Sequence, residues 1–298
     1  MPFDPKLKQI LGKRPPRPKI LTKESVREYQ RLVIKGRPAA PPQPVEIMND
    51  EVQGVRVRIH KPSQGTRLPG LLWFHGGGWV SGAFDDDDST CGEIASRVGC
   101  SVVSVDYGLA PEHKFPEPLD DCFTVLNWVA SNSSIDKDRI GVAGSSAGGN
   151  LAAALALLSR DRSGPKIKFQ LLICGVYDDN PDTASYKENA TGYGLERSQM
   201  IWYWEQYLRG REDRENAYAV PMRAKDLSGL PPALIIGAEY DILRDEAREY
   251  AKKLTAAKVN AQYSEYSGMG HSFVSMRGSL DQGKRAMDLI VNTLRSSL

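Results

Sequence analysis

A glycine-rich hexapeptide, GSSAGG at residues 144–149, is the stretch of this chain best suited to nucleophilic chemistry. Gly144, Ser146 and Gly148 match the pattern G-x-S-x-G, in which a serine lies on a sharp turn between a strand and a helix. The apolar run RIGVAG precedes the turn and the alanine-rich run AGGNLAAALALLSR follows it, which is the context that the pattern requires. Ser146 is therefore the candidate nucleophile, and Ser145 only precedes it. The competing interpretation is a turn without chemistry.

A second glycine-rich segment, HGGGW at residues 75–79, directly follows the apolar run GLLWF. Its glycines leave room for backbone N–H groups to point into a cavity. Together with the N–H of Ala147, which starts the helix after the GSSAGG turn, these groups could bind the oxyanion of a tetrahedral intermediate. A phosphate-binding loop is the alternative, but the patterns G-x-G-x-x-G and G-x-x-x-x-G-K-S/T are both missing from the sequence.

A serine nucleophile needs a general base, and the chain contains four histidines. The order that accompanies G-x-S-x-G is nucleophile, then acid, then histidine. His271, in the loop SGMGHSF near the C-terminus, is the histidine that satisfies this order. The others all precede Ser146; they are His60, His75 and His113.

The acid that orients the histidine is expected just beyond a strand, because ligands bind at the carboxyl ends of the strands in open α/β sheets. Asp241 is the first carboxylate after the strand-like run ALIIGAEY. Asp245 and Glu246 open the next helix, where acidic side chains interact favourably with the helix dipole without a catalytic role. We therefore expect Asp241 to be the acid.

Two other groups of residues invite a metal or redox interpretation. Four consecutive aspartates in FDDDDS cannot all face one ion, and they precede a helix, so we expect them to be solvated and helix-capping. The four cysteines show no CxxC spacing and lie in predicted helices or strands, which favours buried thiols. We expect neither a metal nor another cofactor.

The rest of the chain predicts an α/β fold in which strands alternate with helices, hence a mostly parallel sheet covered on both faces. One long segment between two strands, Tyr177–Met222, breaks the alternation and is interpreted as an insertion over one end of the sheet. The predicted strands are VRVRIH, GLLWFH, CSVVSVDY, RIGVAG, KFQLLIC, ALIIGAEY and AQYSEY. The predicted helices are TKESVREYQRLVIKG with Thr22 as N-cap, EIASRVG, EPLDDCFTVLNWVAS, AGGNLAAALALLSR, DEAREYAKKLTAAK and a closing helix through residues 287–294.

Composition narrows the class of partner. The 298 residues carry 39 basic and 37 acidic side chains, a formal charge of +2, so no strong field attracts nucleic acid or a membrane surface. The N-terminal 21 residues contain prolines and scattered charges instead of a signal sequence, and no stretch is long enough to span a bilayer. We expect a cytoplasmic protein whose partner is a small molecule, with no nucleic acid and no membrane.

Taken together, these segments resemble the hormone-sensitive-lipase-like, or family IV, esterases of the α/β-hydrolase superfamily. The resemblance covers the chain from about residue 44 and rests on HGGGW, DYGLAPEHKFP, GSSAGG, LPPALIIGAEYDILRDEA and GHSF, in this order. It implies an α/β-hydrolase fold with about eight strands and a helical cap. It also implies Ser146 as nucleophile, Asp241 as acid and His271 as base, an oxyanion hole from the N–H groups of Gly77, Gly78 and Ala147, and a possible homodimer.

The resemblance also implies a division of the chain and a pocket. Residues 1–43 and 178–222 would form the cap, and residues 44–177 and 223–298 the catalytic core. The aromatic run MIWYWEQY resembles the helix that overhangs the substrate. The expected pocket residues are Trp79, Ser145, Trp202 and Tyr203. Two departures concern charge, because the family often has Asp and Arg where this chain has Ser145 and Gly108.

The implied function is a serine carboxylesterase that hydrolyses short- to medium-chain acyl esters, or a compact natural-product ester, through an acyl-enzyme on Ser146. HGGGW also satisfies the H-G-G-x-W pattern of kynurenine formamidases, so an amidase of that type is an alternative. A ligand receptor on the same fold is a further alternative, although such receptors have lost the histidine that this chain keeps as His271.

Overall fold

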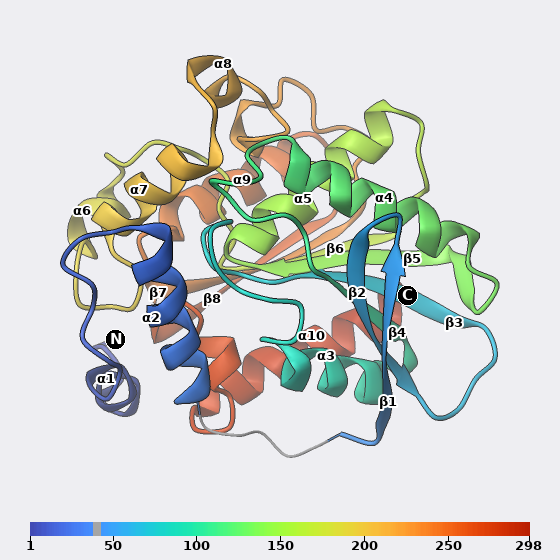
Figure 1. Ribbon diagram of the computed structural model, residues 1–298, viewed down its shortest axis with the longest axis horizontal. Helices are drawn as coiled ribbons and strands as arrows, with labels where there is room; N and C mark the ends of the chain where they lie inside the picture. Colours follow the sequence, from blue (N-terminus) through green and yellow to red (C-terminus); the bar gives the residue numbers. More distant parts are fainter. Residues whose placement is uncertain (38–42) are drawn as a thin grey trace.

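The computed structural model describes residues 1–37 and 43–298. A twisted sheet runs through its centre, with the strand order β1-β2-β4-β3-β5-β6-β7-β8 (Figure 1). β2 is antiparallel to β1 and β4, and all other neighbours are parallel. The expected α/β fold with a mostly parallel sheet is therefore confirmed. The strands are β1 Val45–Val52, β2 Val55–Pro62, β3 Leu68–Phe74, β4 Ser101–Val105, β5 Ile135–Ser145, β6 Phe169–Ile173, β7 Ala233–Tyr240 and β8 Ala261–Gly270.

Helices cover both faces of this sheet (Figure 1). α4, α5 and α9 contact one face, and α3 and α10 contact the other. The α-helices are α1 Pro5–Gly12, α2 Lys23–Lys35, α3 Asp88–Ile94, α4 Glu117–Ser131, α5 Ala147–Asp161, α6 Ala184–Glu188, α7 Arg197–Tyr207, α8 Arg211–Arg214, α9 Arg244–Ala256 and α10 Asp281–Ser297. Short turns of other helix types are η1 Ala95–Gly99, η2 Pro221–Arg223 and η3 Phe273–Met276.

The central elements are apolar on every side because they are buried on every side. All residues of β3, β4 and β6 are buried. α5 is buried from Ala147 to Ser159, and its run of alanines lets it pack closely against the sheet. Each face of the sheet carries its own apolar cluster, so the strand ends between the two clusters are held rigidly.

The sequence reasoning missed β1. Most of its residues, VEIMNDEV, are exposed, so they lack the alternation of apolar and polar residues that marks a half-buried strand. β1 exists because it pairs along its whole length with β2. The two residues that connect the strands, Gln53 and Gly54, both have positive φ angles, 51° and 89°, as a tight hairpin turn requires.

The structure confirms one predicted helix near the N-terminus, adds a second and changes the bounds of the helix expected over residues 93–99. α2 begins after Thr22, whose side chain accepts from the Ser25 N–H, so the expected N-cap is confirmed. α1 was not expected; the Asp4 side chain caps it, accepting from the Leu7 N–H at 2.9 Å. The helix expected over residues 93–99 begins earlier as α3 and continues as the π-turn η1.

The two expected cap segments meet beside the carboxyl ends of the parallel strands (Figure 1). Arg17 joins them: its guanidinium donates to the Gln199 side chain and to the Gly194 carbonyl, and its Nε lies 3.2 Å from Glu196 Oε1. Residues 38–42 of the expected N-terminal cap segment lie outside the described residues, and the division into cap and core stays a prediction.

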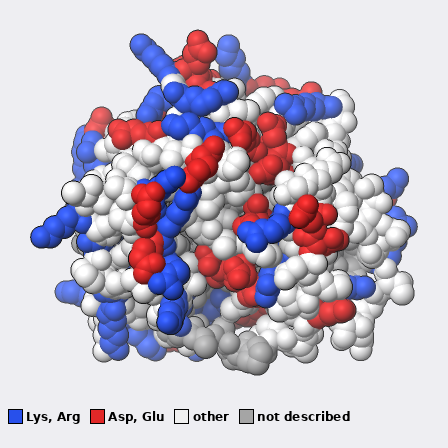
Figure 2. All heavy atoms as spheres, viewed as in Figure 1, with Lys and Arg blue, Asp and Glu red and all other residues white. Residues whose placement is uncertain are grey.

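Charges of both signs are mixed on the face of the molecule that Figure 2 shows. On the face seen in Figure 2, basic and acidic side chains alternate instead of gathering into a patch of one sign. Within residues 1–37 and 43–298, every helix is too short or too polar to cross a bilayer.

Candidate active site

Ser146 lies on a strained turn between β5 and α5. Its backbone has φ 57° and ψ −121°, which a non-glycine residue adopts only where the surrounding structure forces it. The Ser146 N–H donates to the Ile173 carbonyl at 2.8 Å, which ties the turn to the end of β6. A Cβ at Gly148 would overlap the Phe74 carbonyl, so the last position of the pattern requires glycine for close approach. The turn therefore has the geometry expected of a nucleophile elbow.

A chain of two hydrogen bonds connects Ser146 to Asp241 through His271. Nε2 of His271 lies 3.0 Å from Ser146 Oγ, and Nδ1 lies 2.7 Å from Asp241 Oδ2. The side chains are almost inaccessible to solvent: the exposed fraction is 8% for Ser146, 2% for Asp241 and 8% for His271. A buried carboxylate at Nδ1 holds the imidazole in the tautomer that leaves Nε2 free to accept the serine proton.

The positions of Asp241 and His271 follow from the sheet. Asp241 comes directly after β7 and His271 directly after β8. Both therefore lie at the carboxyl ends of the parallel strands, where Ser146 follows β5. Asp241 is anchored by its own loop, because its Oδ1 accepts from the Leu243 N–H at 3.1 Å. The Asn189 side chain also donates to the Asp241 carbonyl at 3.3 Å. Tertiary structure thus brings together three residues that are spread over 125 positions of the sequence.

The glycine loop faces the same turn. Gly77 and Gly78 line a cavity together with Ser146 and His271, and in the described part of the chain no hydrogen bond occupies the N–H of either glycine. Ala147 is buried and does not line the cavity, but its N–H belongs to the first turn of α5, where intrahelical partners are missing. Three backbone donors are therefore available close to the Ser146 hydroxyl.

His75 shapes this loop. Its ring is buried and stacks on Tyr107 with the centroids 4.3 Å apart, and its Nδ1 lies 2.7 Å from the Gly76 carbonyl. Tyr107 in turn donates to the His75 carbonyl at 2.8 Å. Burial lowers the pKa of His75, which favours the neutral ring. His60 contacts Asp88 and His113 contacts Glu117, so neither approaches Ser146.

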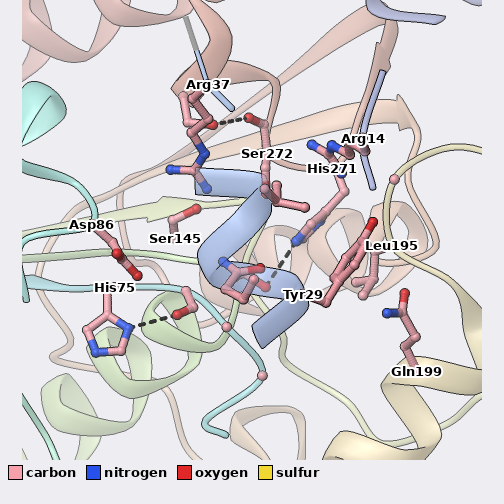
Figure 3. A pocket seen from close by; sticks show the side chains of 18 of the residues that line it. Arg14, Tyr29, Arg37, His75, Asp86, Ser145, Leu195, Gln199, His271 and Ser272 are labelled. Atoms are coloured by element: carbon pink, nitrogen blue, oxygen red, sulfur yellow. Dashed lines mark hydrogen bonds between the residues drawn. The ribbon is translucent and has the colours of Figure 1, made fainter. Parts of the chain in front are cut away.

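The Ser146 cavity has a volume of about 100 Å³ and is lined by residues of the expected core and of both expected cap segments (Figure 3). Of the four residues expected in the pocket, Ser145 and Tyr203 line it. Burial raises the pKa of Tyr203 to about 12, so its phenol stays neutral and offers a hydrogen-bond donor.

Trp79 and Trp202 correct the expectation. Trp79 is fully buried and stacks on Tyr207 with parallel rings 4.3 Å apart, so it packs the glycine loop against α7. Trp202 is half-buried and contacts Tyr203 edge to face at 5.5 Å without lining the cavity. Aromatic residues on a helix can serve either packing or binding, and the adjacent residues Trp202 and Tyr203 differ in this respect because they point in different directions from α7.

The aspartate run is also corrected. Only Asp85 is exposed, and Asp87 forms no side-chain cap on α3. Asp87 accepts from the Trp73 indole at 3.0 Å and Asp88 lies 2.9 Å from Arg58, so both make tertiary contacts. Asp86 lines the Ser146 cavity, and burial raises its pKa to about 6. The run positions the loop before α3 instead of capping it in solvent.

The two residues that depart from the family pattern, Ser145 and Gly108, differ in whether they line the Ser146 cavity. Ser145 ends β5 and faces the cavity. The Gly108 N–H donates to Asp121 at 2.8 Å, and a Cβ at Gly108 would lie 2.8 Å from His113. Gly108 is therefore fitted closely into the loop after β4 and does not line the cavity.

One cysteine lies beside the hydrogen-bonded chain. Ligand atoms of Cys174, Asp241 and His271 lie within 4.8 Å of one another, the one such grouping in the described ranges. Burial, and then the charge of Asp241, raises the pKa of Cys174 well above its usual range, so the thiol stays protonated. All four cysteines are free and buried.

Several lining residues were missed by sequence reasoning because they come from the N-terminal segment, from the loop before α7 and from the first turn of α7. No pattern marks them, since each reaches the cavity only through the fold. They are Arg14, Arg17, Tyr29, Gln30, Val33, Arg37, Gly194, Leu195 and Gln199.

Comparison with known proteins agrees with this geometry. A family described as alpha/beta hydrolase fold matches residues 71–275. Carboxylesterase NlhH of Mycobacterium tuberculosis is 39% identical over 233 residues, which cover 76% of this chain and 73% of that protein. An arylesterase of Saccharolobus solfataricus is 38% identical over 73% of this chain and 72% of its own length. The structure of a hyperthermophilic esterase from Pyrobaculum calidifontis superimposes with a TM-score of 0.91 at 38% identity and covers 99% of both chains.

A second solved structure, a thermostable esterase from Pseudomonas putida, gives a TM-score of 0.93 at 32% identity and covers 100% of this chain and 98% of its own. The match to the family model, the sequence identity to the curated relatives and the structural similarity over the whole length agree with one another. This chain belongs to the α/β-hydrolase superfamily, in its hormone-sensitive-lipase-like group.

Proposed function

We propose that this protein is a serine carboxylesterase with Ser146 as the nucleophile, His271 as the general base and Asp241 as the orienting acid. The single observation that carries the proposal is the buried chain from Ser146 Oγ through the His271 ring to Asp241, with links of 3.0 and 2.7 Å. The names of the relatives support the ester as the bond cleaved, since they include a carboxylesterase, an arylesterase and an ethyl acetate hydrolase. These names favour the esterase over the formamidase and the receptor.

The reaction follows from the geometry in two halves. In the first, His271 Nε2 accepts the hydroxyl proton as Ser146 Oγ bonds to the ester carbonyl carbon, and the imidazolium then gives that proton to the departing alcohol. In the second, His271 takes a proton from water as the water attacks the acyl-enzyme, and returns it to Ser146 as the acid leaves. Asp241 stabilises the imidazolium in both halves.

The oxyanion of each tetrahedral intermediate would bind to the N–H groups of Gly77, Gly78 and Ala147. Two of these donors line the cavity, and the glycine N–H groups have no partner in the described residues. Each such donor contributes about 2.7–4 kcal/mol to transition-state stabilisation in related chemistry. No step in this scheme requires a metal or cofactor.

The size of the cavity supports small substrates. About 100 Å³ is available around Ser146, enclosed by Tyr203 and Gln199 of α7 and by Tyr29 of α2. We therefore propose short- to medium-chain acyl esters or a compact natural-product ester. A series of p-nitrophenyl esters should give the highest kcat/KM at short chains, and a maximum at long chains would contradict the proposed size limit.

Labelling by a fluorophosphonate probe tests the nucleophile directly. We expect stoichiometric labelling of the wild type, with mass spectrometry placing the adduct on Ser146 and not on its neighbour Ser145. The Ser146→Ala variant should lose both labelling and hydrolysis of p-nitrophenyl acetate. The matched control is Ser131→Ala, an exposed serine of α4. Labelling that persists in Ser146→Ala would refute the assignment.

A further inference from the structure

The Ser146 cavity is lined by three arginines, all from the N-terminal segment that precedes β1. They are Arg14, Arg17 and Arg37. Figure 3 shows Arg14 and Arg37 around the hollow that His271 and Ser272 also face. Cations are not needed for the proposed ester cleavage itself, in which charge develops on an oxyanion held by backbone N–H groups. Their presence beside the nucleophile calls for a ligand-based explanation.

Two of the arginines are already neutralised. Arg17 pairs with Glu196 at 3.2 Å and also donates to Gln199 and Gly194, so it connects the two cap segments. Arg37 lies 3.7 Å from Asp87. Arg14 differs: within residues 1–37 and 43–298 its guanidinium forms no ion pair. One positive charge at the cavity is therefore uncompensated by an adjacent carboxylate.

Arg14 is partly withdrawn from water. Burial lowers the pKa of its guanidinium, the nearby Arg37 and Arg17 add to that effect, and the phenol of Tyr29 opposes it. A cation that is partly withdrawn from water and lacks a counter-charge is destabilised, and a ligand that supplies the counter-charge offsets that cost. The guanidinium has a planar fork of donors that matches a carboxylate.

Arg14 also lines a second hollow beside the cavity. This hollow, of about 410 Å³, shares Arg14, Arg17, Tyr29 and Gly194 with the Ser146 cavity. Lys8 lines the second hollow as well, while its one acidic residue, Glu196, is the partner of Arg17. A molecule whose ester group occupies the Ser146 cavity would extend past Arg14 into a hollow that carries excess positive charge.

The acidic groups on the Ser146 cavity do not cancel this charge at Arg14. Asp87 is engaged by Arg37 and by the Trp73 indole. Asp86 accepts from the Ala83 N–H at 2.9 Å and has no arginine within ion-pair distance among the described residues. Figure 3 places Asp86 near His75, on the other side of the hollow from Arg14.

We propose that Arg14 binds a carboxylate of the substrate, so that the preferred esters are half-esters of short dicarboxylic acids, with the free carboxylate at Arg14 and the ester carbonyl at Ser146. This inference rests on the proposed esterase function and specifies its substrate class. The bond that is broken is the same, and the second carboxylate takes no part in the proton transfers. Neutral esters remain substrates, but without the interaction at Arg14.

A matched pair of substrates tests the inference. Monomethyl glutarate carries the free carboxylate, and methyl glutaramate replaces it by a neutral amide of the same size; hydrolysis of each is followed in a pH-stat. We expect the wild type to favour the half-ester in kcat/KM. Arg14→Met should lower kcat/KM for monomethyl glutarate about tenfold to a hundredfold, mainly through KM, because a hydrogen bond to a charged group is lost. Methyl glutaramate should change less than about threefold.

Two further variants make the result specific. Arg14→Lys keeps the charge but loses the fork, and should restore part of the preference for the half-ester. Lys13→Met removes the same charge from an exposed neighbour that lines neither hollow, and should leave both substrates unaffected. An equal loss for both esters in Arg14→Met would mean a structural role for Arg14 and would overturn the inference.

Failure of the inference can be separated from failure of the proposed function. Turnover of both esters without discrimination, with fluorophosphonate labelling of Ser146 intact, overturns the carboxylate site alone. Absence of labelling and of turnover with both esters overturns the esterase assignment and the inference together. Labelling without turnover of either ester also counts against the inference, because half-esters would then not be substrates.

Discussion

Nδ1 of His271 lies 2.7 Å from Oδ2 of Asp241, and both side chains are buried. A short contact of this kind between an imidazole and a carboxylate fixes the orientation of the ring and the nitrogen that carries its proton. The Ser146 hydroxyl then meets the other ring nitrogen at 3.0 Å. The competence of the proposed nucleophile thus depends on a residue that does not touch it.

Replacing that carboxylate by an amide should disable the base while keeping the shape. We expect Asp241→Asn to lower kcat for p-nitrophenyl acetate about 10³- to 10⁴-fold, because the amide can stabilise the wrong imidazole tautomer. KM should change little. Asp245→Asn is the matched control. Asp245 Oδ2 accepts a hydrogen bond from the Ser185 N–H at 2.8 Å, and an asparagine oxygen can still accept this hydrogen bond. A similar loss of kcat in both variants would contradict the assignment of the acid.

The glycine loop tolerates no side chain at Gly78. Its φ of 62° is unfavourable for alanine, and a Cβ there would overlap the Tyr203 ring. We expect Gly78→Ala to lower kcat about 10²- to 10³-fold, because displacement of the loop removes an oxyanion donor. Kinetics with p-nitrophenyl acetate measure the effect.

Gly99→Ala provides the control for backbone strain. Gly99 also has positive φ, 80°, but a Cβ there would meet no atom within 4 Å. This variant should lose about 1 kcal/mol of unfolding free energy and keep its kcat. If both alanine variants kept full activity, the glycine loop would not form the oxyanion hole.

Asp86 should make stability depend on pH. Its pKa is about 6 in the folded protein, raised mainly by burial, against 3.8 for an ordinary aspartate. The folded protein therefore holds this proton more tightly, so the contribution of Asp86 to stability falls as the pH rises from about 4 to 6. The difference in pKa corresponds to at most about 3 kcal/mol, and partial exposure reduces it to about 1–2 kcal/mol.

Asp86→Asn should accordingly raise the free energy of unfolding by about 1–2 kcal/mol at pH 7.5 and by little at pH 4. The amide oxygen can still accept from the Ala83 N–H, which keeps the loop in place. Urea unfolding at the two pH values measures the effect, with the exposed neighbour in Asp85→Asn as control. Equal stabilisation at both pH values would contradict burial of the ionised carboxylate as the cause.

The cysteines should be unreactive in the folded protein. All four are buried, and burial raises the pKa of Cys100 to about 12 and those of Cys91, Cys122 and Cys174 well above the usual range. The reactive thiolate is therefore suppressed as well as shielded. Ellman's reagent at pH 8 should release no colour from the native protein and detect four thiols in guanidinium chloride. Rapid reaction of one native thiol would contradict its burial.

Local patterns were sufficient for most of the fold. Continuous apolar runs such as GLLWF predicted buried parallel strands, and the 3.6-residue spacing in residues 287–294 predicted the last helix. β1 escaped because its stability comes from pairing with β2 and not from burial of its own side chains. The candidate triad could be predicted from the sequence for the same reason as the fold, because each of its members directly follows a recognisable strand.

The sequence by itself determined which residues could form a nucleophile, a base and an acid, because strand order and the motif around Ser146 restrict those positions. Only the tertiary structure decided what surrounds them. Trp79 packs in the core instead of lining the pocket, and Asp86 lines the Ser146 cavity instead of lying in solvent. Arg14 lines the same cavity although it is far from Ser146 in the sequence. Chemical roles are encoded in local patterns, whereas the walls of a pocket depend on how distant segments pack, and no local pattern records that packing.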